Sequence, residues 1–375
     1  MSIQLSRRNL LKASGIALGA RAFPLLPAFS ETPASTLTAG PAPLVRLSFN
    51  ENPFGPSPRV AEAIHGELTH LNRYADESAA QQLAEQIAAH ELLPVEQVVL
   101  GEILGLLGTV FASEGGPGSE FLYSTPGYLA LIDAAARLGG VGVPVPLNAH
   151  YENDLAALSQ NITPMTRAIY LVNPHNPTGT VSDNRAFKEF LGASSQHAVA
   201  IVDEAYLEYT EDFNERSAVS LVRQGANVAV FRTFDKIHGL AGLPIGYVLA
   251  PRALADALRK QGAGDAEALG RLNIVAAAAA LSDTEQVVHT RAAIARERAK
   301  WQIVLNDLKL PHTDSQTNFI FFDAGLPQAT LAAAFRAQGV DIGRAHPPYI
   351  NWARITIGLP EENLRAQNAL RQALR

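Results

Sequence analysis

Short runs of apolar and β-branched residues recur along the chain and alternate with longer segments of helical pattern. Such runs are typical of strands that are buried on both faces of a sheet. Between them lie stretches of helical pattern such as residues 185–191. This alternation indicates βαβ units in a parallel or mixed sheet that helices cover on both faces. The runs expected as strands are 98–100, 168–172, 199–202, 228–231 and 245–249.

The pattern changes after residue 251, where helical segments dominate, including the amphipathic stretch 291–308. Two later apolar runs, 318–322 and 353–357, each precede a helical segment. This arrangement indicates a second, smaller α+β unit. The predicted fold class is α/β, with a large, mostly parallel sheet domain at about residues 70–260 and a small α+β domain formed by about 45–69 and 261–375.

The first 30 residues follow a different pattern, with Arg7 and Arg8 ahead of a weakly apolar stretch at 13–28. Arg21 and Pro24 interrupt that stretch, which is too short and broken to span a bilayer as a helix. A charged start, an apolar middle and a small-residue exit are typical of a secretory signal.

The paired arginines resemble a twin-arginine export signal. We therefore predict a signal at residues 1–30, a Pro- and Thr-containing linker at 31–44, and a periplasmic protein that meets the membrane only during export. The alternative is the basic amphipathic start of a cytosolic helix.

Composition narrows the function classes. Hydrophobic residues make up 47% of the 375 residues and charged residues 18%, which is typical of a globular protein. The net charge is −6 with no long basic run, so no nucleic-acid partner is expected. The chain has no cysteine and its ten histidines are scattered, so we expect no metal site.

Polar motifs come directly after three of the predicted strands. They are Asn-Pro-His-Asn-Pro-Thr-Gly at 173–179, Asp-Glu-Ala-Tyr at 203–206 and Thr-Phe-Asp-Lys at 233–236. In open α/β sheets, ligands bind outside the carboxyl ends of the strands. Three motifs in succession therefore predict one shared crevice.

These motifs, with Asn-Glu-Asn-Pro-Phe-Gly-Pro at 50–56, Arg-Tyr at 73–74, Pro-Gly-Tyr at 126–128 and Arg-Ile-Thr-Ile-Gly at 354–358, identify a resemblance. From about residue 47 to its end, the chain resembles class I/II aminotransferases of the aspartate-aminotransferase fold, in particular the histidinol-phosphate aminotransferase branch. The resemblance implies a seven-stranded sheet and the cofactor pyridoxal 5'-phosphate (PLP). It also implies amino-group transfer between an amino acid and a 2-oxo acid.

The resemblance assigns the cofactor to five residues near the predicted strand ends. Lys236 would hold PLP as a Schiff base and shuttle a proton, and Thr233 of the same motif would contact the cofactor. Asp203 would face the pyridine nitrogen and favour the protonated ring. Asn176 and Tyr206 would bond the phenolic oxygen. The alternatives are a surface lysine, a helix N-cap, a turn asparagine and a core tyrosine.

Four further residues complete the implied site. Tyr128 would stack on the ring, and Arg354 would clamp the substrate carboxylate with its two-pronged guanidinium. Asn52 would line the substrate side. Tyr74 would reach the cofactor phosphate of a neighbouring subunit, which implies a homodimer. The alternatives are ordinary packing for Tyr128 and a solvated strand end for Arg354.

The chain departs from the family's phosphate-binding pattern at three positions. Glu102 lies where a Ser- or Thr-rich turn is usual, Asp235 replaces a serine, and Pro244 replaces an arginine. Two acidic residues thus replace hydrogen-bond donors, and a proline replaces the expected cation. Arg232 and Lys260 are two basic residues that could compensate.

Other functions remain open from the sequence. The same scaffold supports decarboxylation, racemisation or β-elimination, and the altered phosphate site leaves room for a non-catalytic binder of PLP or an amino acid. The export signal argues against histidinol phosphate as substrate, because that chemistry belongs in the cytoplasm. No Gly-x-Gly-x-x-Gly or P-loop pattern supports nucleotide binding.

Overall fold

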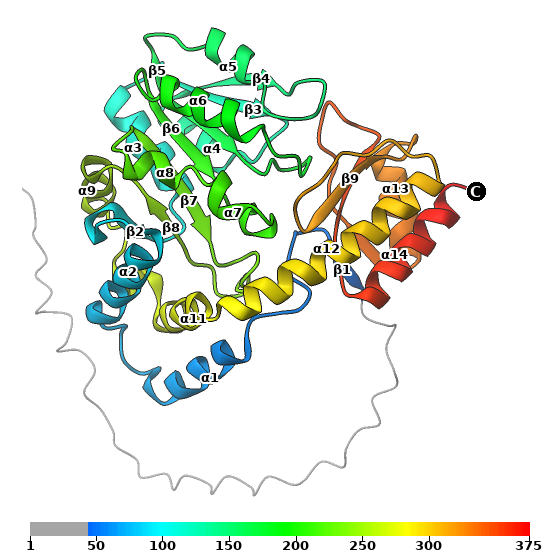
Figure 1. Cartoon of the computed structure of the whole chain (residues 1–375), viewed down its shortest axis with the longest axis horizontal. Coiled ribbons are helices and arrows are strands. Elements are labelled where there is room, and N and C mark those ends of the chain that lie inside the picture. Colours follow the sequence, from blue (N-terminus) through cyan, green and yellow to red (C-terminus); the bar gives the residue numbers. More distant parts are fainter. Residues whose placement is uncertain (1–43) are drawn as a thin grey trace, which may run out of the picture. The chain divides into compact units, whose positions relative to one another are not determined.

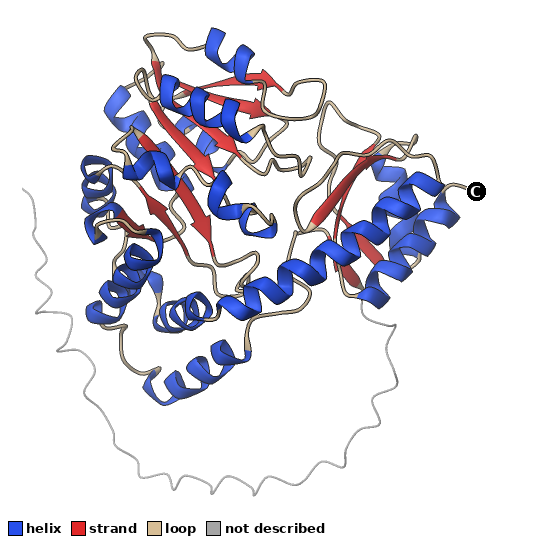
Figure 2. Ribbon diagram, viewed as in Figure 1, coloured by secondary structure: helices blue, strands red, loops and turns tan. Residues whose placement is uncertain are grey.

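The computed structural model describes residues 44–375, which fall within one compact unit. The predicted signal at 1–30 and nearly all of the linker at 31–44 lie outside the described residues. The predicted domain boundaries at about residues 70 and 260 stay a prediction. Figure 1 shows the order of the elements, and Figure 2 shows helices surrounding the strands.

A seven-stranded sheet in the order β2-β8-β7-β6-β5-β3-β4 forms the larger layer. The neighbours from β7 through β4 pair in parallel, whereas β8 pairs antiparallel with both β7 and β2. The mostly parallel sheet predicted from the sequence is confirmed. The strands are β2 Val98–Leu100, β3 Glu120–Thr125, β4 Val141–Pro146, β5 Thr166–Val172, β6 Val199–Asp203, β7 Val228–Thr233 and β8 Gly246–Leu249.

Both faces of this sheet are buried, which explains the unbroken apolar runs. In β5, Ile169 and Leu171 pack into one hydrophobic cluster, whereas Ala168, Tyr170 and Val172 pack into another. Alternate residues of a strand point to opposite faces, so each cluster covers one face. Helices α2, α6, α8 and α11 contribute to the first cluster, and α3, α4 and α9 to the second.

A smaller region contains two two-stranded sheets. Strand β1 (Val45–Leu47) pairs in parallel with β10 (Val340–Ile342), and β9 (Phe319–Asp323) pairs antiparallel with β11 (Trp352–Thr356). The 24-residue helix α12 (Thr284–Asp307) contacts β9 and α14 (Pro360–Ala373), as Figure 1 shows. A third hydrophobic cluster joins this region to Tyr206 and Ile237.

The remaining helices have the following bounds. They are α1 Pro58–Glu67, α2 Glu77–Glu91, α3 Leu104–Gly115, α4 Ala130–Ala136, α5 Leu155–Gln160, α6 Asn184–Ser194, α7 Phe213–Arg216, α8 Val219–Arg223, α9 Arg252–Lys260, α10 Ala266–Leu269, α11 Arg271–Ser282 and α13 Gln328–Ala337. Short 3-10 helices span Leu68–His70, Val95–Gln97 and Leu207–Tyr209.

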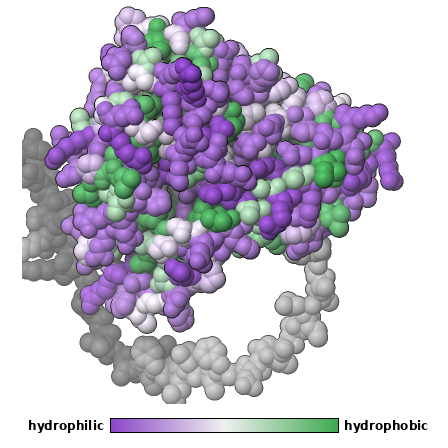
Figure 3. Space-filling model, in the orientation of Figure 1, coloured by the Kyte–Doolittle hydropathy of each residue, from purple (hydrophilic) through white to green (hydrophobic). Residues whose placement is uncertain are grey.

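The outer surface is mixed rather than apolar. On the face shown in Figure 3, hydrophobic residues are scattered among hydrophilic ones. None of the helices between residues 44 and 375 is both long enough and apolar enough to cross a membrane.

Candidate active site

The three motif-bearing strands β5, β6 and β7 are consecutive neighbours in the sheet. Their carboxyl ends therefore lie side by side, and the segments after them open into one cavity of about 920 Å³. Lys236, Asp203, Tyr206 and Asn176 line this cavity together with Arg354 from the separate strand β11. The shared crevice predicted from the motifs is thus present in the structure.

Asp203 is the last residue of β6 and is buried. One carboxylate oxygen accepts a hydrogen bond from the Tyr170 hydroxyl at 2.9 Å, and the other accepts from the Ala205 backbone N–H at 3.0 Å. Burial raises the pKa of Asp203 to about 6, against the opposing effects of these two bonds and of Lys236. A positively charged ligand group in the cavity would favour the ionised form of Asp203, so this carboxyl group is suited to bind a cationic ligand atom.

Lys236 follows β7 and lines the cavity rather than the outer surface. Its ammonium nitrogen lies 6.0 Å from the ring centroid of Tyr206. The Tyr206 hydroxyl accepts a hydrogen bond from Asn50 at 3.1 Å, which fixes the direction of the ring. The amine therefore lies over an aromatic face, close enough to Asp203 for its charge to lower the pKa of that carboxyl.

Arg354 is a partly buried residue of β11 rather than a solvated strand end. It donates to the Asn176 side-chain oxygen at 2.7 Å and to the Ser48 carbonyl at 2.9 Å. Its Nε is buried and has no hydrogen-bond partner among the described residues. Desolvation lowers the pKa of Arg354, and a partly buried guanidinium with an unpaired donor is suited to a carboxylate ligand.

The other predicted residues fall into two groups. Tyr128 and Thr233 line the cavity, and Tyr128 is about half exposed. Asn52 does not line it, because its side chain donates to the Ile237 carbonyl at 2.8 Å next to a different hollow. Tyr74 is 79% exposed and lies outside the cavity of its own chain.

Several lining or supporting residues escaped the sequence reasoning. Asn50 belongs to the motif at 50–56, of which only Asn52 was expected at the site, and Tyr170 lies in an ordinary apolar strand run. Arg344 and His346 also line the cavity. His346 is buried, its Nε2 has no partner in the described part of the chain, and burial lowers its pKa to about 3. No local pattern in the sequence marked these two.

One end of the cavity is acidic. Glu102 and Asp235 line it, and Lys236 is the only cation among the charges that shift the pKa of either acid in the described part of the chain. The Glu102 side chain is exposed to solvent, yet desolvation at the cavity wall, and then the charges of Asp235 and Asp203, raise its pKa to about 7. Lys260 is exposed and lines no cavity here, so it does not compensate for Pro244.

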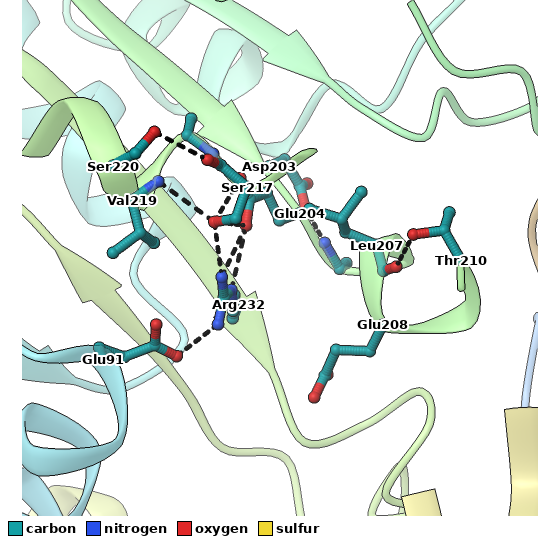
Figure 4. A network of polar contacts seen from close by, with 12 residues as sticks. Glu91, Asp203, Glu204, Leu207, Glu208, Thr210, Ser217, Val219, Ser220 and Arg232 are labelled. Carbon is teal, nitrogen blue, oxygen red and sulfur yellow. Dashed lines mark hydrogen bonds and ion pairs between the residues drawn. The ribbon is translucent and has the colours of Figure 1, made fainter. Parts of the chain in front are cut away.

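Arg232, the other candidate, is committed to a buried network behind the site (Figure 4). It is 3% exposed and pairs with Glu91 and with Glu204, the neighbour of Asp203. Ser217 donates to Glu204 and accepts from Arg232 at 2.8 Å. With its hydrogen bonds taken up by these partners, Arg232 supports the strands rather than serving a ligand.

Comparisons with known proteins agree with this geometry. Residues 42–369 match the family described as aminotransferase class I and II. The chain is 35% identical to the aromatic amino acid aminotransferase of Thermobifida fusca, over 85% of this chain and 87% of that protein. It is 34% identical to the histidinol-phosphate aminotransferase of Symbiobacterium thermophilum, over 88% and 91% of the two chains.

A solved structure is also similar. The histidinol-phosphate aminotransferase from Sinorhizobium meliloti, in complex with pyridoxal-5'-phosphate, superposes with a TM-score of 0.79 at 27% identity. The match covers 93% of this chain and 99% of that one. On the strength of the family match over most of its length, together with relatives above 30% identity, the chain belongs to the class I and II aminotransferases.

Proposed function

We propose that this protein uses PLP, held by Lys236, to move an amino group between an amino acid and a 2-oxo acid. The observation that carries the proposal is the meeting of a strand-end lysine, a buried carboxylate and a partly buried arginine in one cavity. The ring-binding side of the cavity fits PLP, because Asp203 is hydrogen-bonded in place to meet a protonated ring nitrogen. When bound, PLP withdraws electrons from the substrate carbon next to the amino group.

The chain's own residues would supply the remaining steps. The Lys236 amine would hold the cofactor and, once freed by substrate, carry a proton to and from the substrate carbon. Asp203 would keep a negative charge next to the ring nitrogen. Tyr206 and Asn176 would donate hydrogen bonds to the phenolic oxygen. Arg354 would bind the substrate carboxylate through its guanidinium, whose Nε is still unpaired.

Removing the lysine amine tests the proposal directly. Lys236→Ala should abolish turnover and the visible absorbance that borohydride removes from PLP-loaded protein. Lys260→Ala is the matched control, because Lys260 is exposed and lines no cavity described here. Normal turnover in Lys236→Ala would contradict the assignment.

Substrate identity calls for a screen. Purified protein would be offered amino acids and 2-oxo acids, with cofactor absorbance as readout. The screen would include aromatic amino acids and histidinol phosphate, the compounds named in the relatives' descriptions. Arg344 and His346 line the same cavity as Arg354, and both arginines act on the pKa of His346, so they are the residues to vary once a substrate is found.

We further propose a homodimer. Phe49 and Tyr128 line the cavity yet are 64% and 47% exposed, and Tyr74 is exposed outside it. A second copy would cover these rings and bring its Tyr74 to the cofactor phosphate. Light scattering gives the mass, and Tyr74→Ala should weaken PLP binding although Tyr74 does not line its own chain's cavity.

We also propose export to the periplasm through a twin-arginine signal, supported by Arg7 and Arg8 ahead of an apolar stretch. A route that carries folded cargo suits an enzyme that is loaded with its cofactor before export.

A further inference from the structure

The end of the cavity next to helix α3 combines two features that oppose each other. Helix α3 begins at Leu104 with no side-chain cap, and Leu104 and Gly105 line the cavity. The unpaired N–H groups of a helix start attract an anion such as a phosphate. Glu102 and Asp235 line the same end of the cavity and, when ionised, repel one.

Neither acid is neutralised by an ion pair or a basic neighbour other than Lys236. No salt bridge within residues 44–375 involves Glu102 or Asp235, and one Asp235 carboxylate oxygen is buried without a hydrogen-bond partner. Glu102 also borders a smaller hollow with Asp265, and the described residues lining that hollow include no lysine or arginine. The phosphate end is thus richer in carboxylates than in cations.

Resting on the proposed function, we infer that Glu102 receives the phosphate of PLP only in its protonated form, so that cofactor binding takes up a proton. A protonated carboxyl donates a hydrogen bond to a phosphate oxygen, whereas a carboxylate can only accept. PLP arrives nearly dianionic at neutral pH, because the second phosphate pKa is about 6. A proton shared between the Glu102 carboxyl and the PLP phosphate removes the repulsion between two negative charges.

The charged groups around Glu102 determine whether PLP affinity rises or falls with pH. Desolvation at the cavity wall and the charges of Asp235 and Asp203 together raise the pKa of Glu102 to about 7, against the opposing charge of Lys236. Tyr128 also faces it across the cavity. An added phosphate raises the pKa again, so PLP affinity is full below about pH 7 and falls as the pH rises above it.

The experiment compares PLP with pyridoxal, which forms the same bond with Lys236 but lacks the phosphate. We use the ratio of the PLP affinity to the pyridoxal affinity. The pH dependence of Lys236 cancels in this ratio, which leaves the contribution of the phosphate. We expect this ratio to fall about five- to twentyfold between pH 6.5 and 8.5, which corresponds to a rise in the pKa of Glu102 of about one to two units on binding. Spectroscopic titration of apo-protein supplies the affinities.

Variants separate Glu102 from other charges. Glu102→Gln should raise the ratio about tenfold or more at pH 8.5, change it little at pH 6.5 and flatten the profile. Glu114→Gln is the matched control, since Glu114 is an exposed residue at the other end of the same helix. The pair Asp235→Ser and Pro244→Arg, which adds a donor and a cation, should tighten PLP binding over the whole pH range.

Calorimetry of the unchanged protein gives a second readout that needs no variant. Titrations at pH 7.5 in buffers of different ionisation enthalpy should show more proton uptake with PLP than with pyridoxal, by up to about one proton. A ratio that stays constant with pH, equal in Glu102→Gln, would overturn this inference and leave the proposed function intact. Failure of both aldehydes to bind at every pH would overturn the proposed function as well.

Discussion

Replacing Arg232 by methionine tests what the buried network in Figure 4 contributes to stability. The guanidinium is 3% exposed and lies between Glu91 and Glu204, whose side chains are 5% and 1% exposed. Methionine fills similar space but leaves both carboxylates without their cation. Breaking a buried pair from one side costs about 3–5 kcal/mol, because an uncompensated charge stays in the interior.

Each carboxylate keeps at least one hydrogen bond in the variant, so we expect the loss in free energy of unfolding to stay within about 3–5 kcal/mol. Glu204 still accepts from the Ala218 N–H at 2.7 Å and from Ser217, and Glu91 accepts from the Tyr247 hydroxyl at 3.2 Å. We expect the urea midpoint of the apo-protein to fall by about 1 M or more, followed by the fluorescence of the two tryptophans. Arg185→Met is the control, since its ion pair is exposed and worth less than about 1 kcal/mol.

The loss should also depend on pH. Burial raises the pKa of Glu204 even with Arg232 in place, and removing the cation raises it further. The folded variant then holds protons that the unfolded chain releases above about pH 4.3, so its stability is lost as the pH rises. Adding Glu204→Gln should recover part of the loss. A variant as stable as the Arg185→Met control, or one that recovers with rising pH, would refute the reasoning.

Three further predictions concern the site, the packing and the signal. Asp203→Asn should retain PLP but lose about 10²-fold or more in rate, measured by steady-state kinetics, since a neutral amide cannot stabilise the ring charge; near-normal rates would contradict that role. Gly108→Ala should lower the thermal midpoint, because its Cβ would lie 2.1 Å from a carbonyl oxygen of α4, whereas Gly192→Ala on α6 meets nothing and should be neutral or stabilising. Replacing Arg7 and Arg8 with lysines should leave full-length precursor inside the cell; unchanged fractionation would count against a twin-arginine signal.

The sequence predicted well those strands that form unbroken apolar runs, because both their faces are buried. The run predicted at 98–100 is β2, and those at 168–172 and 199–202 lie within β5 and β6. Two strands of the large sheet, β3 and β4, were not predicted. Strand β4 alternates valine with glycine and proline at the sheet edge, where proline is tolerated, so its pattern resembles a loop.

The candidate site was predictable where it depends on strand ends and less so where it depends on distant contacts. Lys236 and Asp203 follow adjacent strands, so the order of motifs placed them together. Tyr170 contacts Asp203 only because β5 lies beside β6, and His346 reaches the cavity from a loop between β10 and β11. Contacts between residues that are distant in sequence arise from tertiary packing, and no local sequence pattern predicts them.

The hydrogen bonds that hold Asp203 have a consequence for the thermodynamics of ligand entry. Its two oxygens are oriented by hydrogen bonds from Tyr170 and Ala205, so little conformational entropy remains to be lost at that carboxylate. The half-exposed ring of Tyr128 has more freedom to lose. Ordering on ligand entry should therefore concentrate at the cavity mouth, and the unfavourable entropy of binding should respond to changes at Tyr128 more than to changes at Tyr170.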